Sequence, residues 1–191
     1  MKIGLFFGSF NPIHVGHLII ANYMAANTDL DAVWLVVSPH NPHKEKSTLA
    51  DDYTRLHLVN LAIENNLRLQ SCDIEFNLPQ PSYTSDTLAH LKAQYPKDEF
   101  VLIMGGDNLA TLHKWKNYQF ILKNYQIYVY NRPNADVSAY QNDANVRFFD
   151  VPLMEISATF IRQLIQKDCS VRYLVPDKVC EEIDKANLYK L

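Results

Sequence analysis

Two histidines that follow the first apolar run of the chain have the types and spacing needed for chemistry. The run ends at Gly8, and His14 and His17 follow three residues apart, which places both imidazoles on one face of a helix. A glycine at a strand end allows a ligand to approach the backbone closely, and the first turn of a helix attracts anions. Gly16 leaves room for a flat ring or a sugar. The pattern therefore predicts an anion site.

An alternative for this segment is one solvated and one core histidine, with Gly16 as a packing residue. A metal site is the weaker interpretation, because no third ligand is evident nearby in the sequence.

A second polar cluster opens a helical stretch near the end of the chain. Ser157 is a good helix N-cap, Thr159 stands in the first turn, and Arg162 lies on the same face as Thr159. Phe160 occupies the position where a capping box would have Glu or Gln. We therefore expect this helix start to be open to an external anion, the alternative being an ordinary cap with an arginine that faces solvent.

Two further groups follow other strand-like runs. Pro39–Lys44 is stiffened by prolines and, together with Lys46, brings two histidines and two lysines into a short segment. This composition fits a solvated loop as well as a functional segment. Gly105 and Gly106 permit close approach of a base or ribose, and the following Asp107 can accept from two ribose hydroxyls. Trp115 either stacks on an aromatic ring or is a half-buried core residue.

Regular elements must position these groups, and strand-like runs alternate with helical patterns along the chain. The strand-like runs are Lys2–Phe7, Ala32–Val37, Leu67–Ile74, Phe100–Met104, Gln126–Tyr130 and Val146–Val151. The helical patterns are His14–Asn27, Asp51–Asn65, Tyr83–Gln94, Tyr118–Lys123, Ser157–Lys167 and Pro176–Ala186. This alternation predicts βαβ units and a parallel sheet covered on both faces.

We therefore expect an α/β fold in one domain over residues 1–191. It has a Rossmann-like, doubly wound parallel sheet of about six strands and a helical C-terminal tail. In such sheets, ligands bind at the carboxyl ends of the strands, which is where the candidate residues fall.

Composition narrows the classes of function. The 191 residues include 18 basic and 21 acidic side chains, a net charge of −3, which is a poor match for a general nucleic-acid or membrane-surface binder. Cys72, Cys169 and Cys180 are widely spaced and odd in number, so we expect reduced thiols rather than a disulfide framework. No signal peptide or membrane-spanning run is recognisable. We expect a soluble, cytoplasmic protein.

The first and last clusters resemble two motifs of the nucleotidyltransferase superfamily. Gly8–His17 resembles its G-x-F-[DN]-P-x-H-x-G-H signature, and Ile156–Arg162 is similar to its I-S-S-T-x-I-R motif. The resemblance implies that both histidines contact ATP phosphates and that the second motif cradles these phosphates from the far side. Ala158 replaces the second serine of that motif, so one hydroxyl contact is missing.

The segments between these motifs resemble the nicotinate-nucleotide adenylyltransferase branch. Pro39–Lys44 resembles its P-x-x-P-H-K stretch, Pro81–Thr87 its P-S-Y-T-x-D-T-L segment, and Asp107–Trp115 its aspartate–tryptophan segment. Asn131–Pro133 is similar to its R-P turn. The resemblance implies adenylyl transfer from ATP to nicotinate mononucleotide, which gives the dinucleotide and pyrophosphate. Mg²⁺ is implied as a companion of ATP, with no metal site on the protein itself.

The resemblance also implies a role for each matching residue. The implied catalytic residues, which supply positive charge, are His14, His17, Lys44 and Arg162. The implied ATP-binding residues are Gly8, Ser9, Phe10, His14, Gly16, His17, Gly105, Asp107, Ser157, Thr159 and Arg162. The implied mononucleotide-binding residues are Ser9, Phe10, Lys44, Tyr83, Thr84, Asp107, Trp115, Lys116 and Arg132.

Several alternatives stay open at this point. Nicotinamide mononucleotide is a close rival substrate, and a pantetheine-phosphate adenylyltransferase shares the first and last motifs. A non-catalytic nucleotide-binding regulator is disfavoured by the intact His14, His17 and Arg162. An aminoacyl-tRNA synthetase shares H-x-G-H, but the chain shows neither a second lysine signature nor an anticodon-binding extension. A homo-oligomer is open, whereas nucleic-acid and membrane partners are not expected.

Overall fold

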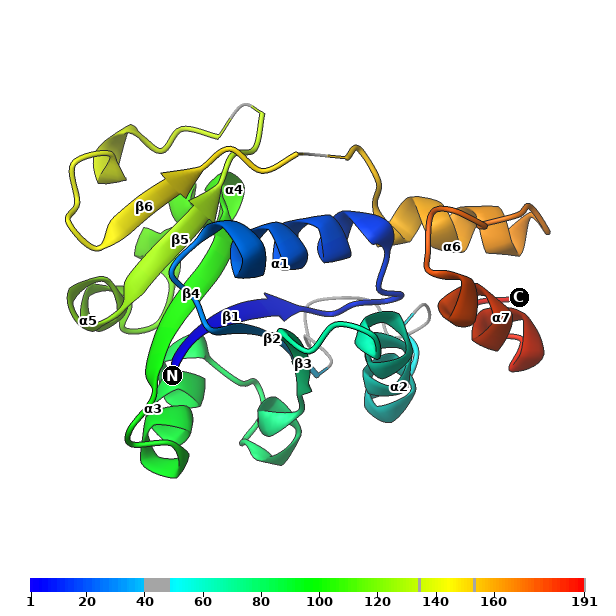
Figure 1. The fold of residues 1–191 in the computed structure, drawn as a ribbon, viewed down its shortest axis with the longest axis horizontal. Coiled ribbons are helices and arrows are strands. Elements are labelled where there is room, and N and C mark those ends of the chain that lie inside the picture. The colour runs from blue at the N-terminus through cyan, green and yellow to red at the C-terminus, as the bar shows by residue number, and fades with distance from the viewer. Residues whose placement is uncertain (40–48, 134, 153, 191) are drawn as a thin grey trace.

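Six parallel strands form one sheet at the centre of the protein (Figure 1). The computed structural model describes residues 1–39, 49–133, 135–152 and 154–190. The strands are β1 (Lys2–Gly8), β2 (Ala32–Val37), β3 (Leu69–Cys72), β4 (Glu99–Gly105), β5 (Gln126–Tyr130) and β6 (Val146–Phe149). They lie in the order β3-β2-β1-β4-β5-β6, and each neighbouring pair is parallel. The predicted doubly wound α/β sheet is confirmed.

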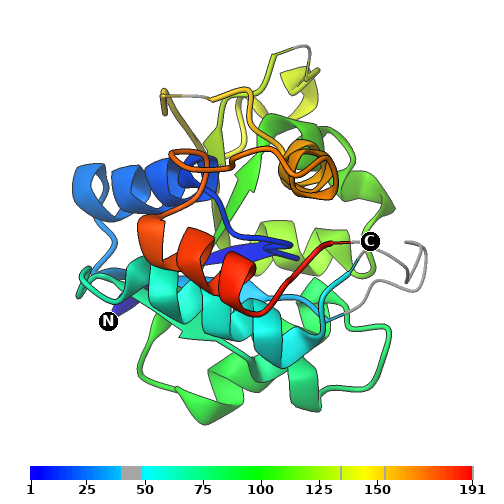
Figure 2. The ribbon, with the colours of Figure 1, turned by 90° about the vertical axis from the view of Figure 1, so that its right-hand side faces the viewer.

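Alternating side chains of the strands feed two hydrophobic cores, one on each face of the sheet. Along β1, Phe6 faces one core and Leu5 faces the other. The core of Phe6 is covered by α1 (Val15–Asn27), α2 (Asp52–Ile63), α6 (Ala158–Gln166) and α7 (Asp177–Lys185). The core of Leu5 is covered by α3 (Thr84–Gln94), α4 (Gly106–Ala110) and α5 (Tyr118–Asn124). Figure 2 shows α7 alongside α2, so the predicted helical C-terminal tail packs back onto the domain.

The two central strands, β1 and β4, create the crevice in which ligands of such folds bind. They are neighbours in register, with Phe6 opposite Ile103. From β1 the chain proceeds towards β2 and β3, whereas from β4 it proceeds towards β5 and β6. Their carboxyl ends therefore diverge at a topological switch point. Gly8 and Gly105 are the last residues of these strands, so the predicted site residues on both flank this crevice.

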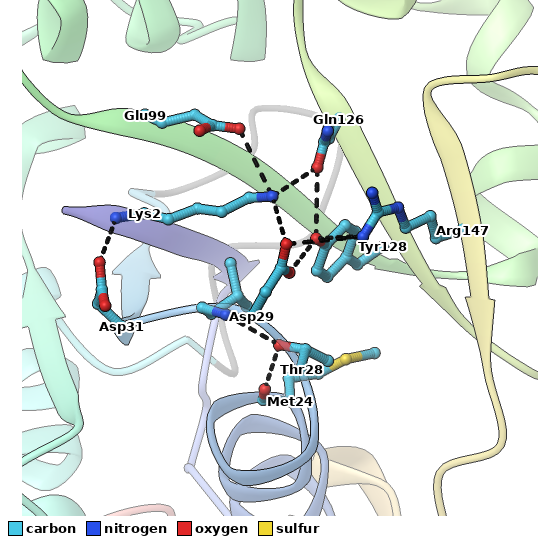
Figure 3. Close-up of polar contacts among 10 residues, drawn as sticks. Lys2, Met24, Thr28, Asp29, Asp31, Glu99, Gln126, Tyr128 and Arg147 are labelled. Atoms are coloured by element: carbon cyan, nitrogen blue, oxygen red, sulfur yellow. Dashed lines mark hydrogen bonds and ion pairs between the residues drawn. The ribbon is translucent and has the colours of Figure 1, made fainter.

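The opposite, amino edge of the sheet is held by a polar network (Figure 3). The Lys2 ammonium donates to Asp29 at 2.8 Å and to Gln126 at 2.8 Å, and the Tyr128 hydroxyl donates to Asp29. Arg147 adds an ion pair to Asp29 at 3.6 Å. These contacts join β1, β5 and β6 at the edge away from the crevice, so the network fixes the sheet rather than forming part of the site.

The predicted elements differ from the observed ones mainly at their ends. α1 begins at Val15, with His14 as its N-cap, because a cap residue carries the same sequence signal as the helix it precedes. β3 is shorter than predicted, since the chain turns into a 3₁₀ helix at Ile74–Asn77. α4 was not predicted, because its glycine start has low helix propensity. Within the described ranges, no helix is long and apolar enough to cross a membrane.

Candidate nucleotide site at the switch point

The two histidines of the first motif lie against each other at the start of α1. Their rings stack with centroids 3.6 Å apart and an interplanar angle of 25°. The backbone N–H of His14 donates to Nδ1 of His17 at 3.2 Å. Because Nδ1 of His17 is an acceptor, the proton of its neutral ring resides on Nε2. The pair therefore offers an oriented N–H donor at the carboxyl end of β1.

Burial makes both histidines neutral. His14 is 6% exposed, and this burial, with the nearby Arg132 charge, lowers the pKa of His14 to about 4. Burial, followed by the charges of His14 and Arg132, holds the pKa of His17 well below its ordinary value. Neutral imidazoles are therefore favoured at this site, since removing an imidazolium from water is costly, and the expectation that the histidines supply positive charge to ATP stays a prediction. They act there as hydrogen-bond donors, and Arg132 carries the charge.

Phe10 packs against the ring of His17. Its backbone has a φ of 43°, its side chain is 1% exposed, and its ring meets that of His17 edge to face at 5.0 Å. A Cβ on Gly8 would lie 2.8 Å from the Phe10 ring, so glycine is required there. We expected Phe10 to contact substrates; its side chain instead fixes His17, which leaves only its backbone for a ligand.

Gly16 lies directly beside the His14 ring. A Cβ at this position would lie 3.1 Å from the His14 imidazole. The glycine therefore gives the His14 ring room at the helix start, and its expected contact with a substrate stays a prediction.

Arg162 brings the last motif to the first one. Its guanidinium donates to the carbonyl of Asn11 at 2.8 Å and to the Thr159 hydroxyl at 3.3 Å. The Ser157 hydroxyl caps α6 by accepting from the Phe160 N–H at 3.1 Å. This helix start is therefore less open than expected, because one amide is already satisfied. The amides of residues 158 and 159 have no acceptor within the helix.

A third group of predicted residues gathers where β4 and β5 end. Gly105 is the N-cap of α4, and a Cβ there would lie 2.3 Å from a carboxylate oxygen of Asp107 and 3.2 Å from Arg132. The Arg132 guanidinium lies over the Tyr130 ring at 5.4 Å. Arg132 and the exposed Asp107 thus lie around Gly105 at the end of β4, and the charge of Arg132 helps to lower the pKa of both histidines.

Four predicted mononucleotide residues line one cavity of about 270 Å³ at the start of α3. They are Tyr83, Thr84, Trp115 and Lys116, joined by Ser82 and Lys114. The Lys116 ammonium lies 4.5 Å from the centre of the Tyr83 ring and pairs with Asp86 at 2.9 Å. Trp115 is partly buried and packs against the core, so the interpretation as a half-buried core residue is confirmed, while stacking on an aromatic ring stays a prediction. A larger cavity of about 550 Å³, beside Trp34 and Tyr95, contains none of the predicted residues.

Lys44 and most of the Pro39–Lys44 segment lie outside the described residues.

Two residues that hold the backbone around the site were not identified from the sequence. The side chain of Asn11 accepts the Ala50 N–H at 3.1 Å, and Arg55 of α2 is 0% exposed. Arg55 precedes the core residue Val59 by one helical turn, so an arginine on the buried face of this helix was the available signal.

Comparison with known proteins agrees with this geometry. Residues 5–164 match the family described as cytidylyltransferase-like. The chain is 58% identical over 192 residues to a protein of Flavobacterium psychrophilum named "Probable nicotinate-nucleotide adenylyltransferase", with 100% of both chains covered. A protein of the same name from Flavobacterium johnsoniae is 55% identical, also over 100% of both chains.

A solved structure supplies a match to the fold. It is that of Plasmodium falciparum nicotinic acid mononucleotide adenylyltransferase complexed with NaAD, at a TM-score of 0.84 and 19% identity. The match covers 98% of this chain and 97% of that chain. At this identity the likeness establishes the fold, while the two bacterial proteins establish the kinship.

Proposed function

Since the chain belongs to the nicotinate-nucleotide adenylyltransferase family, within the larger cytidylyltransferase-like family, we propose that the crevice between β1 and β4 is where it performs adenylyl transfer. The enzyme transfers the adenylyl group of ATP to nicotinate mononucleotide and releases pyrophosphate. The contact between Arg162 and Asn11 carries this assignment, because it unites the two phosphate motifs at one end of the sheet.

Charge stabilisation and positioning account for the catalysis. An oxygen of the mononucleotide phosphate attacks the α-phosphorus of ATP, the bond from that phosphorus to the oxygen bridging to the β-phosphorus breaks, and pyrophosphate leaves. The attacking oxygen is already anionic, so no general base is needed. The protein must instead place donors where negative charge accumulates. His17 Nε2–H and the guanidinium of Arg162 are such donors.

The motif at the start of α6 acts through its amides, its hydroxyls and Arg162. The Ser157 and Thr159 hydroxyls each accept one internal hydrogen bond, and each keeps its own hydrogen to donate to a phosphate oxygen. Ala158 lacks a hydroxyl but keeps its backbone N–H. The substitution therefore removes one donor and leaves the helix N-terminus as an anion site.

Mg²⁺ accompanies ATP in this proposal. The donors gathered around the crevice are N–H groups, hydroxyls and guanidinium groups, which suit phosphate oxygens rather than a metal. Within the described residues, no cluster of three or more His, Cys, Asp or Glu side chains could hold a metal ion. An ion held by the triphosphate and water is the usual arrangement for Mg²⁺ in nucleotide enzymes, and Mg²⁺ would offset triphosphate charge there.

The cavity beside Trp115 is proposed to take the pyridine ring. Trp115 offers an aromatic face for stacking, and α3 begins at Thr84 with Tyr83 as its N-cap. The first amides of this helix carry positive dipole character, and Lys116, which is paired with Asp86, adds an ammonium group to the same wall. A carboxylate suits these donors, whereas a carboxamide brings an NH₂ group against them. Selectivity for the acid follows.

The cytoplasm is the proposed compartment of the protein. Cys72, Cys169 and Cys180 are all free thiols, which supports the cytoplasm as the compartment. A homo-oligomer stays a prediction.

Incubating the protein with ATP, Mg²⁺ and nicotinate mononucleotide tests the proposal. Stoichiometric formation of the dinucleotide and pyrophosphate is the expected result, with a rate about 100-fold lower in His17→Ala. Absence of the dinucleotide with folded wild-type protein would contradict it.

A further inference from the structure

Arg55 is a fully buried arginine that no substrate role explains. It is 0% exposed, and its guanidinium donates to three backbone carbonyls. The acceptors are Ala50 at 3.0 Å, Ser9 at 2.5 Å and Ser38 at 2.8 Å. The side chain of Asp52 accepts a fourth hydrogen bond and neutralises the charge. A buried cation needs such complete pairing.

The carbonyls that Arg55 holds belong to the segments that frame the crevice. Ser9 is the first residue after β1, and Ser38 is the first residue after β2. Ala50 precedes α2, and its N–H is held by the Asn11 side chain at 3.1 Å. Ser38 and Ala50 stand on either side of residues 39–49, the part of the sequence that contains Lys44. One guanidinium therefore ties both flanks of this stretch to the turn after β1.

We propose that Arg55 is a positioning residue for the phosphate site, which it serves by fixing the turn that carries the histidine pair. Ser9 directly precedes Phe10, whose left-handed backbone and buried ring set the position of His17. Holding the Ser9 carbonyl thus fixes the direction in which Phe10 enters the core, and through it the His17 ring. Arg55 acts on the reaction through His17 and touches no substrate itself.

This inference rests on the proposed function, because it takes the histidine pair to meet the phosphates. A purely structural arginine would change stability alone, whereas a positioning arginine also changes the ring of His17 and the rate of the chemical step.

The test uses Arg55→Lys, which keeps the charge but cannot span three carbonyls with one planar group. The matched control is Arg68→Lys at the amino edge of the sheet. Arg68 likewise donates to backbone carbonyls, those of Asp31 and Leu30. Urea unfolding establishes that each variant is folded. Kinetics with both substrates then separate kcat from KM, and ¹⁵N NMR of the imidazoles reports the tautomer of His17 without substrate.

We expect Arg55→Lys to lower kcat by about 30-fold or more, since a small displacement of a catalytic group has effects of this order. The KM for nicotinate mononucleotide should change by less than about threefold, because Trp115 packs against one core and the α2 residues Leu58 and Val59 against the other. The His17 ring should lose its pure Nε2–H tautomer. Arg68→Lys should leave both the rate and the tautomer as in the wild type.

The proposal is wrong if the His17 resonances of Arg55→Lys match the wild type, or if its kcat stays within threefold. Should Arg55→Lys fail to fold, Asp52→Asn removes only the paired charge and should shift the same resonances to a smaller extent; unshifted resonances in that variant would overturn the proposal. If the wild type makes no dinucleotide, the proposed function fails, but the NMR comparison still decides the role of Arg55.

Discussion

The guanidinium of Arg162 donates to the backbone carbonyl of Asn11 at 2.8 Å across 151 residues of sequence. This hydrogen bond joins the start of α6 to the turn after β1. It also means that Arg162 serves two purposes, because it holds the turn of the first motif and brings a positive charge to it. A substitution at Arg162 should therefore change the KM for ATP more than it changes the free energy of unfolding.

Arg162→Lys keeps the charge but loses the planar fork that reaches Asn11 and a phosphate together. We expect the KM for ATP to rise by about tenfold, the loss of roughly one charge-assisted hydrogen bond. Steady-state kinetics at saturating mononucleotide measure this effect. Arg172→Lys, at an exposed arginine beyond α6, is the control and should behave as the wild type. An unchanged KM for ATP would show that Arg162 does not contact the nucleotide.

His17→Ala removes the oriented Nε2–H donor from the start of α1. Because this donor is expected to act mainly on charge that develops in the transition state, kcat should fall by about 100-fold or more. The KM for either substrate should change far less. Rapid-quench measurement of the first turnover separates the chemical step from product release. A variant with wild-type kcat would remove His17 from the mechanism.

Stability below neutral pH should depend on His14. Its pKa is about 4 in the folded protein, whereas an unfolded histidine titrates near about 6.5. Between these values the unfolded chain binds a proton that the folded chain does not, so the free energy of unfolding falls as the pH decreases. The loss should approach about 2 kcal/mol at pH 5 and should vanish above neutrality. His17 contributes in the same direction.

Urea unfolding between pH 7.5 and 5 measures this dependence. His14→Gln should flatten the pH profile, whereas His113→Gln, which removes an exposed histidine, should leave the slope intact. Parallel profiles for the wild type and His14→Gln would show that His14 takes up its proton without penalty.

Two residues of the Trp115 cavity should have different effects. Trp115 should affect the binding of both mononucleotides, and Lys116 should affect the preference for the acid. Trp115→Ala should raise the KM for both the acid and the amide mononucleotide, because ring stacking does not distinguish them. Lys116→Met should reduce the preference for the acid by about tenfold, since one favourable contact with the carboxylate is lost. Lys97→Met removes a surface charge elsewhere and should alter neither quantity. Equal acid preference in Lys116→Met and the wild type would assign selectivity to the α3 amides alone.

The sequence predicted the sheet better than it predicted the contacts that the candidate site residues make with one another. The strand runs, the six-stranded parallel sheet and the histidine spacing follow from local periodicity, and Ala32–Val37 and Gln126–Tyr130 match the observed strands. The protonation of the histidines depends on burial by Phe10 and on Arg132, contacts that no local pattern contains. The contact between Gly16 and the His14 ring is likewise visible only in the folded structure.

Tertiary hydrogen bonds also explain why Arg55 was not assigned to the site. Its acceptors are backbone carbonyls from the turn after β1 and from two positions between β2 and α2, and backbone groups leave no trace in residue identity. The helix pattern of α2 placed an arginine beside apolar positions, but only the fold shows that its partners lie at the ends of β1 and β2. The Arg162–Asn11 contact was hidden for the same reason.

Selectivity for nicotinate mononucleotide is tested most directly by comparing its kcat/KM with that of nicotinamide mononucleotide. Both are measured with ATP and Mg²⁺, and pyrophosphate release is the signal. An unpaired polar group in the pyridine cavity costs about 1–3 kcal/mol, so the acid should be favoured by roughly 10- to 100-fold. The same assay should show no turnover without a mononucleotide. Equal values for the two substrates, or a preference for the amide, would contradict the account of the Tyr83, Trp115 and Lys116 cavity.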